Sequence, residues 1–392
     1  MLVTPTIEPI AKLKVIGLGG AGGNAVNTMI SDYSIEGVEF MAFNSDQQAL
    51  KNSLAPITLQ LGEELTRGLG VGGDHVLGAQ AAEESLDEIH EYLAGSDMVF
   101  LTAGMGGGTG TGSIPVVAGV SGNLGALTVA VVTKPFNFEG RKRLEVAEEG
   151  IAALKDKVDT LIVVPNQRLL DIIDTDISFL DAMKKVDNVL AEGVKSITSL
   201  VTQTGFINVD FADVKSVMSS AGTSLMGIGK AKGEGRAEEA ARMATQSPLL
   251  DMSIEGATGV LFNVIGGVDM SMKEVDLSAE LISDAVDPNA NIIFGATIDE
   301  SLSDEIVITI VATGFDETKR PMSASNSSKS SQSNDDDDSD DKRKSSVSID
   351  DFDLGDSNSS APEKPAPTKS KDGDGDSDKK DLEIPAFLRR GK

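Results

Sequence analysis

Two glycine-rich segments are the parts of this chain best suited to bind a phosphorylated ligand. Gly17–Asn24 holds five glycines in its first seven positions, and Gly104–Gly112 holds six glycines in nine. Backbone N–H groups at a helix N-terminus can surround phosphate oxygens when no side chain stands in the way. Each segment follows an apolar strand pattern and precedes a helical one, so we expect two loops that grip one long polyphosphate.

Together the two loops narrow the class of nucleotide-binding protein. The first contains GxGxxG at Gly17, Gly19 and Gly22, which also suits an NAD-dependent oxidoreductase. Asp46 lies near the place where such an enzyme needs an acidic residue, but that class leaves the second loop unexplained. A P-loop kinase or ATPase needs GxxxxGK[ST], whose lysine both loops lack. Backbone dipoles and a magnesium ion must then neutralise the phosphates.

A pair of carboxylates is the third element that could do chemistry. Asp210 and Asp213 lie three residues apart in the segment NVDFADV, which also contains Asn208, at an expected loop-to-helix turn. Such carboxylates can orient an attacking water or help to place a cation. An aspartate before a helix is more commonly an N-cap, and the spacing alone favours that simpler role.

The elements expected around these residues are those of an α/β fold with a Rossmann-like parallel sheet. Amphipathic helical stretches at 74–93 and 139–154 separate short buried strands, and ligands of such sheets bind beyond the carboxyl ends of the strands. The expected strands of this first domain cover residues 13–16, 38–43, 98–102, 128–132 and 161–164.

We expect five parts along the chain. A long helical pattern at 177–201 is apolar on much of its surface, so it should be a buried helix that links two domains. The second domain should be α+β, with strands at 260–265, 292–298 and 306–313 and a glycine-rich connection at 227–235. The five parts are a sheet domain at 1–176, a central helix at 177–204, the second domain at 205–316, a linker at 317–380 and a terminal peptide at 381–392.

The linker and the terminal peptide differ in composition. Residues 321–380 hold 16 serines and only five Met, Val, Ile, Phe and Leu residues together, so they cannot bury enough apolar surface to order themselves. Apolar residues return in DLEIPAFLRR at the end of the chain, which favours a docking peptide on a flexible tether. As a flexible coil, the 64 residues of 317–380 would span about 45 Å.

Composition excludes several other classes of protein. The chain has no cysteine and only two histidines, His75 and His90, which argues against thiolate chemistry, a multi-histidine metal centre and a Ser-His-Asp triad. Its net charge is −28, and the first 320 residues carry 45 acidic against 22 basic side chains. Such a surface repels nucleic acid and anionic membranes, and a saline habitat is one possible reason for it. With no membrane-spanning apolar run and no signal pattern, we expect a cytoplasmic protein that does not insert into membranes.

The loop GMGGGTGTG resembles the signature of the tubulin/FtsZ superfamily, and in particular of its prokaryotic cell-division GTPases. The stretches KVIGLGGAGGNAVN, TKPFNFEG, NVDFADV and IPAFLRR add to this resemblance, which covers residues 12–315 and 381–390. It implies a protein that binds GTP, polymerises head to tail, hydrolyses GTP where two subunits meet and acts at the mid-cell division ring. A superfamily regulator that does not polymerise is the alternative, but the intact Asp210, Asp213 and terminal peptide speak against it.

The resemblance also implies a role for individual residues. Glu139 and Arg143 would reach the ribose and phosphates, although an ordinary i,i+4 ion pair fits their spacing. Asn166 and Asp187 would read the guanine edge, although a solvated helix carboxylate fits Asp187. Met183 stands where many relatives place an aromatic residue, so it would pack on the base or in the core. The residues that would hold the phosphates are Gly20, Ala21, Gly22, Gly23, Asn24, Gly107, Gly108, Thr109 and Gly110.

By the same resemblance, the catalytic residues act on a neighbour. Asn208, Asp210 and Asp213 would point at the GTP of the adjacent subunit, with GDP as product and Mg²⁺ as the accompanying ion, whose protein ligands the sequence leaves open. The terminal peptide would bind division proteins that tether the filament to the membrane. Its residues for that contact are Ile384, Pro385, Ala386, Phe387, Leu388, Arg389 and Arg390.

Overall fold

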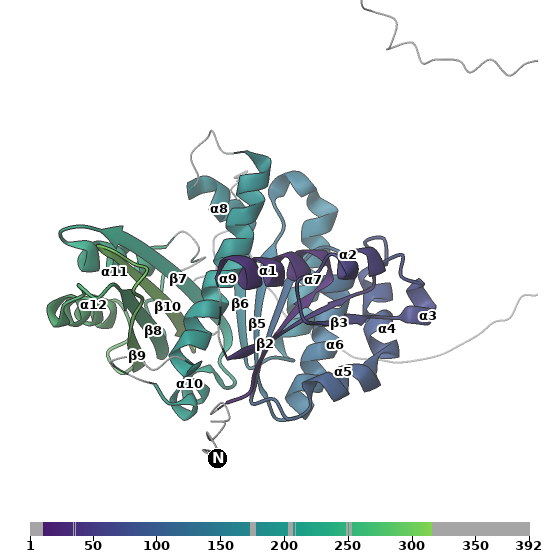
Figure 1. Ribbon diagram of the computed structural model, residues 1–392, viewed down its shortest axis with the longest axis horizontal. Coiled ribbons are helices and arrows are strands. Elements are labelled where there is room, and N and C mark those ends of the chain that lie inside the picture. Colours follow the sequence, from purple (N-terminus) through teal and green to yellow (C-terminus); the bar gives the residue numbers. More distant parts are fainter. Residues whose placement is uncertain are drawn as a thin grey trace, which may run out of the picture. The chain divides into compact units, whose positions relative to one another are not determined.

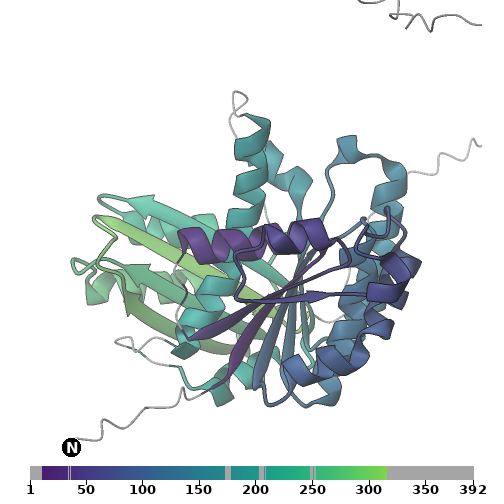
Figure 2. The same cartoon turned by 45° about the vertical axis from the view of Figure 1, so that its right-hand side comes forward.

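The computed structural model shows a mixed α/β fold built on one continuous sheet of ten strands (Figures 1 and 2). It describes residues 11–315 apart from 34, 36, 173–177, 203–206, 208, 248–249 and 251–252. The linker, the terminal peptide and Asn208 therefore lie outside the described residues.

Two groups of strands make up the sheet, in the order β3-β2-β1-β4-β5-β6-β7-β10-β8-β9. The first six strands are parallel, and β7 joins the edge strand β6 in parallel. In the second group β10 is antiparallel to β7 and β8, and β9 is parallel to β8. The bounds are β1 Leu13–Leu18, β2 Val38–Asn44, β3 Ile57–Gln60, β4 Met98–Gly104, β5 Leu127–Lys134, β6 Thr160–Pro165, β7 Gly222–Lys232, β8 Gly259–Gly266, β9 Asn291–Ile298 and β10 Glu305–Thr313.

Helices cover both faces of the parallel group. Core residues of α1 and α9 pack on one face, and core residues of α4, α5, α6 and α7 pack on the other. In the second group α11 and α12 pack on the sheet. The helices are α1 Gly19–Asp32, α2 Gln47–Lys51, α3 Glu63–Thr66, α4 His75–Glu84, α5 Leu86–Leu93, α6 Thr109–Asn123, α7 Arg141–Lys155, α8 Asn166–Ile172, α9 Phe179–Thr202, α10 Phe211–Met218, α11 Arg236–Thr245 and α12 Met272–Asp284, with a 3₁₀ turn η1 at Asn137–Glu139.

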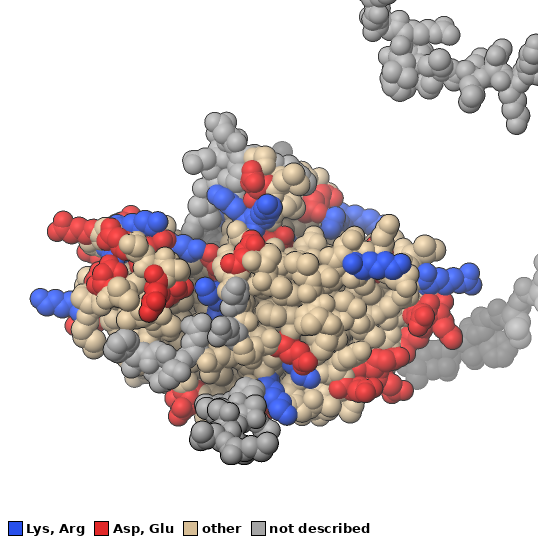
Figure 3. All heavy atoms as spheres, viewed as in Figure 1, with Lys and Arg blue, Asp and Glu red and all other residues tan. Residues whose placement is uncertain are grey.

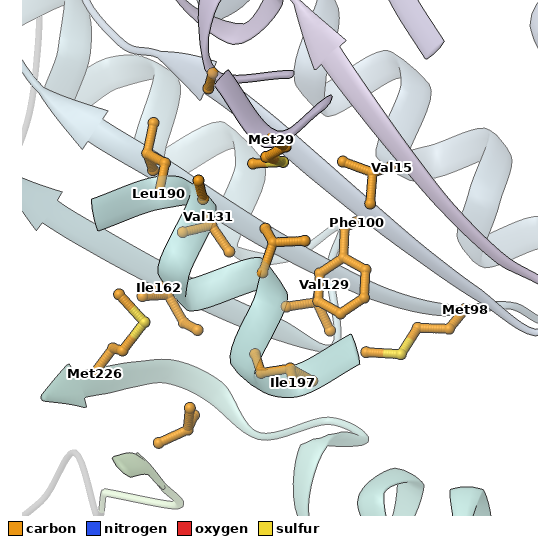
Figure 4. Packing of buried hydrophobic residues seen from close by; sticks show 14 of the residues in the cluster. Val15, Met29, Met98, Phe100, Val129, Val131, Ile162, Leu190, Ile197 and Met226 are labelled. Carbon is orange, nitrogen blue, oxygen red and sulfur yellow. The ribbon is translucent and has the colours of Figure 1, made fainter. Parts of the chain in front are cut away.

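The expected fold class, a parallel-sheet domain with a long central helix and a second domain, is confirmed. On α9, Leu190 and Ile197 are buried and face Val129 and Val131 of the sheet (Figure 4). Burying each such side chain contributes roughly 1.5–3 kcal/mol, so the apolar stripe fixes this helix against the sheet. The domain boundaries at 176, 204 and 316 stay predictions.

The glycine-rich connection expected at 227–235 is wrong, because most of it belongs to strand β7. Ideal Cβ atoms on Gly227 and Gly229 would lie 2.0 Å from the carbonyl oxygens of Ala244 and Ala240 on α11. Glycine therefore serves here to let a helix backbone approach a strand closely, a use that sequence reading took for a loop. Similarly, the single helix expected at 74–93 is divided at Ser85 into α4 and α5.

Acidic side chains lie on the surface of both parts of the fold. On the face drawn in Figure 3, they gather over the second domain and around α5. In the described residues, no helix is long and apolar enough to cross a membrane.

Candidate functional site

The two glycine loops lie side by side at the carboxyl ends of adjacent strands. Strands β1 and β4 are parallel neighbours, with Leu18 opposite Ala103 at their ends. An ideal Cβ on Gly19 would lie 2.7 Å from the backbone nitrogen of Gly110. An ideal Cβ on Gly104 would lie 2.7 Å from the Cβ of Ala21. The loops therefore touch, and the touching positions require glycine.

The remaining loop glycines divide into two kinds. Added Cβ atoms on Gly20, Gly23 and Gly107 would meet no heavy atom within 4 Å outside their chain neighbours. By contrast, a Cβ on Gly22 would lie 2.3 Å from the Thr102 carbonyl oxygen. Gly22 therefore serves mainly the packing of α1 on β4. Gly20, Gly23 and Gly107 instead leave the backbone open to a ligand.

Gly108 and Gly110 also serve packing. A Cβ on Gly108 would lie 2.5 Å from Val71 Cγ2, and one on Gly110 would lie 3.0 Å from the Leu18 carbonyl oxygen. The hydroxyls of Thr109 and Ser45 lie 2.6 Å apart, which links the start of α6 to the carboxyl end of β2.

A cavity of about 190 Å³ opens beside the first loop. Gly20 and Asn24 of α1 line it, together with Asn44 at the end of β2 and Ser53 after α2. Asn44 was not among the candidate site residues predicted from the sequence. The signal that would have found it is its place at the carboxyl end of the parallel strand β2, where ligands of such sheets bind.

Glu139 and Arg143 form the ion pair that their spacing predicts. Arg143 Nη1 lies 2.8 Å from Glu139 Oε2, and the Phe136 backbone N–H donates to Glu139 Oε1 at 2.8 Å. An ideal Cβ on Gly106 would lie 2.5 Å from the Arg143 carbonyl oxygen, so this pair lies beside the second loop. The two charges are therefore already paired with each other, and a ligand that binds either side chain would have to share or replace this ion pair.

Asn166 and Asp187 have unused hydrogen-bonding capacity. Asn166 begins α8 at the carboxyl end of β6, and its buried Oδ1 has no hydrogen-bond partner in the described part of the chain. Burial raises the pKa of the Asp187 carboxyl on α9 to about 6, and no described residue donates a hydrogen bond to it or pairs with it. Buried polar groups are normally paired, so the buried Asn166 oxygen indicates a ligand. The Asp187 carboxyl is half-buried and is available to the same ligand. Met183 is partly buried and packs against the core under α9.

Asp210 and Asp213 lie free on the surface. Asp210 occupies the N-cap position of α10, but its side chain makes no capping hydrogen bond. Both residues are exposed, and within the described residues neither carboxylate takes part in a hydrogen bond or ion pair. The N-cap role that the spacing favours is therefore not realised.

These carboxylates lie at the opposite end of the sheet from the glycine loops. The helix α9 ends at Thr202, whose Cγ2 lies 3.0 Å from an ideal Cβ on Gly37, just before the amino end of β2. After α10, the Ser220 N–H donates to Asp159 Oδ1 at 3.1 Å, just before the amino end of β6. In Figure 1, α8 lies at the upper end of α9 and α10 at its lower end. A six-residue strand spans about 20 Å, so one chain cannot bring both sets of residues to one ligand.

Comparisons with known proteins show the family of this chain. Residues 12–174 match the model of the GTPase domain of the tubulin/FtsZ family, and residues 222–316 match the C-terminal domain of the FtsZ family. A solved FtsZ dimer from M. jannaschii is 47% identical, over 79% of this chain and 89% of that chain, with a TM-score of 0.76. This chain belongs to the tubulin/FtsZ family. It carries the family's GTPase domain, so it is a GTPase that binds GTP and GDP.

A more distant structural match shows the fold alone. The protofilament of CetZ2 from Haloferax volcanii is 22% identical, over 79% of this chain and 95% of that chain, with a TM-score of 0.67. That protofilament is bound to GTPγS. The candidate nucleotide site of this chain rests on its own geometry, which is that of the glycine loops, Asn166 and Asp187.

Proposed function

We propose that this GTPase is a cell-division protein whose subunits assemble head to tail and hydrolyse GTP where two subunits meet. The proposal rests on one observation, which is that the candidate nucleotide-binding residues and the candidate catalytic residues lie at opposite ends of one sheet. The glycine loops occupy one end, and the unpaired carboxylates of Asp210 and Asp213 occupy the other. Stacking identical copies in one direction places each carboxylate pair against the next copy's nucleotide, and such a contact does not close on itself.

In this proposal, one subunit binds the nucleotide and the adjacent subunit supplies the catalytic carboxylates. On one subunit the open backbone at Gly20, Gly23 and Gly107 holds the triphosphate, while Asn166 and Asp187 face guanine N–H and carbonyl groups. On the other, Asp210 and Asp213 orient a water molecule, a role that the family resemblance also gives to Asn208. That water attacks the γ-phosphorus, the bond from this phosphorus to the β–γ bridging oxygen breaks, and GDP and phosphate leave.

Magnesium would enter this site with the nucleotide. The described residues include no group of three or more acidic or histidine side chains that could hold a metal ion. The triphosphate oxygens and water would therefore hold the ion, and the Ser45 and Thr109 hydroxyls beside the loops could add neutral oxygen ligands. When bound, the ion would neutralise charge on the transferred phosphoryl group.

The test of head-to-tail assembly is the dependence of turnover on protein concentration. If the site forms between subunits, turnover per subunit rises with concentration, and sedimentation shows polymer with GTP and little without it. A constant turnover per subunit, with no polymer at any concentration, would identify a GTPase that works as a single chain.

Asp187 gives the nucleotide site a predicted pH dependence. Guanine N–H groups need an ionised acceptor, so GTP affinity should fall as the pH drops through about 6, the pKa of Asp187 in the free protein. Because this pKa lies above the unfolded value, the unpaired charge lowers the stability of the free protein as pH rises from about 4 to about 6. Asp187→Asn should therefore remove the pH dependence of binding, lower affinity at pH 7.5 and raise the melting temperature of the nucleotide-free protein.

Titration with a fluorescent GTP analogue from pH 5 to 8, with thermal unfolding at each pH, measures both effects. Asp181→Asn, a change of an exposed aspartate near the start of α9, is the control. Affinity that stays constant across pH 6 in the unmodified protein would remove Asp187 from the guanine contact.

The terminal peptide gives the proposed role in division its own test. Deletion of residues 381–392 should leave GTP turnover and assembly within about twofold of the full chain, while attachment to membrane-tethering partners at the mid-cell ring is lost. The reason is the apolar patch IPAFLRR beyond a polar linker. Light scattering after GTP addition, and the position of the fluorescently tagged protein in dividing cells, measure the two outcomes. A purified truncated protein that no longer polymerises would contradict the docking role.

A further inference from the structure

The end of α10 opposite its carboxylates is held by side chains that play no part in the site described above. The last four carbonyl groups of a helix lack partners within the helix. In α10, the Thr160 hydroxyl donates to the Met218 carbonyl at 2.5 Å. The Thr313 hydroxyl lies 3.2 Å from the Val217 carbonyl of α10 and 3.2 Å from the Gly259 carbonyl of β8, and it shares its proton between the two. Both threonines are buried. Thr160 begins β6 of the parallel group, whereas Thr313 ends β10 of the second domain, so both parts of the fold hold the helix.

Asp159 holds the turn that follows α10. Its Oδ1 accepts hydrogen bonds from the Ser220 backbone N–H at 3.1 Å and the Ser219 hydroxyl at 3.4 Å. Its Oδ2 accepts from the Thr128 N–H at the start of β5 at 2.9 Å. Ser220 has φ +53°, in the left-handed region that residues other than glycine rarely adopt. A backbone conformation of this kind persists only where several surrounding contacts hold it, and Asp159 supplies one of those contacts.

We propose that Asp159, Thr160 and Thr313 are positioning residues for GTP hydrolysis, an inference that rests on the proposed function. They lie at the end of α10 opposite Asp210 and Asp213, and they fix the direction in which the helix presents these carboxylates to the neighbouring subunit. With eight residues, α10 is about 12 Å long, so a tilt of about 5° at its clamped end moves the carboxylates at its other end by about 1 Å. A misplacement of about 1 Å can cost about 10²-fold in rate.

Thr160→Val tests the inference because it keeps the shape of the side chain and removes the hydroxyl. We expect the turnover of assembled protein to fall about tenfold, with GTP affinity and the amount of polymer within twofold of the unmodified protein. Thr160→Ser, which restores a hydroxyl, should recover at least half of the rate. Ser278→Ala is the control, since its buried hydroxyl donates to a helix carbonyl, that of Glu274 on α12, at 2.8 Å.

Mixing subunits distinguishes positioning from general damage to the fold. In a Thr160→Val chain only the carboxylate face is affected, so its bound GTP should be hydrolysed when a Gly107→Ser chain, with intact carboxylates, sits against it. Mixing with Asp213→Ala should give no such recovery. If Asp213→Ala and Gly107→Ser chains co-assemble but stay inactive together, the shared site itself is wrong.

The positioning role alone is overturned in either of two cases. In one, the Asp213→Ala and Gly107→Ser pair is active but Thr160→Val gains nothing from the Gly107→Ser chain. In the other, Thr160→Val turns over within twofold of the unmodified protein. Should Thr160→Val fail to fold, Thr313→Val removes the second hydroxyl from the other side of α10, with the same expected results.

Discussion

Replacing Asp213 with alanine should leave GTP affinity unchanged and slow GTP turnover by about 10²–10⁴-fold, the range that a lost water-orienting carboxylate commonly costs. The side chain is exposed, and its carboxylate has no hydrogen bond or ion pair in the described part of the chain, so the change costs the free subunit only a small interaction with the helix dipole. The nucleotide loops lie at the other end of the sheet and are untouched. Phosphate release under saturating GTP, together with a binding titration, measures the two quantities.

Asp87→Ala is the matched control. Like Asp213, Asp87 is an exposed acid in the first turn of an eight-residue helix, in this case α5. Losing its interaction with the helix dipole should cost the same small amount of stability, about 0.3–1 kcal/mol, with no effect on turnover. Equal losses of turnover in the two variants would show that Asp213 acts through stability or net charge and not on the nucleotide.

The mixture of two inactive variants locates the carboxylate. An Asp213→Ala chain keeps its nucleotide site, and a Gly107→Ser chain keeps Asp210 and Asp213. Each alone should be nearly inactive, and the mixture should regain turnover because an intact carboxylate pair meets an intact nucleotide site at some contacts. A mixture that co-assembles without activity would mean that Asp213 works within its own chain.

Much of the fold could be predicted because the buried strands of the parallel sheet carry strong local signals. Uninterrupted apolar runs such as 98–102 and 128–132 fall within β4 and β5, and the stripe along 177–201 marks α9. Strand β7 could not be recognised in the same way. Its glycines satisfy the close approach of α11, a tertiary contact that leaves no local periodicity.

The candidate site was predictable in part. Glycine in a loop indicates that a side chain is excluded, but the sequence does not say what excludes it. Gly22 makes room for a strand carbonyl, while Gly107 faces open space. Nor could spacing show that the Asp210 side chain would make no cap. It could not show either that strands of both groups would hold α10, since those contacts join residues up to about a hundred positions apart.

Gly107→Ser should lower GTP affinity by about 100-fold, which corresponds to about 2.7 kcal/mol. An added Cβ at this position meets nothing within 4 Å in the free protein, and the residue does not lie in the left-handed region of backbone conformation. The free protein should therefore keep its melting temperature within about 2 °C. No described residue lies where the added Cβ would be, so we expect the serine side chain to obstruct a ligand that approaches the backbone of the second loop.

Gly119→Ser is the control that separates this effect from the chemistry of a glycine-to-serine change. Gly119 lies within α6, the helix that the second loop begins, and an added Cβ there also meets nothing within 4 Å. GTP affinity should be unchanged in that variant, and its melting temperature should rise slightly because a helix interior disfavours glycine. Calorimetric titration of GTP and GDP into both proteins gives the comparison. Full affinity in Gly107→Ser would exclude the second loop from the phosphate contact, whereas loss of affinity together with a lowered melting temperature would assign Gly107 to the fold.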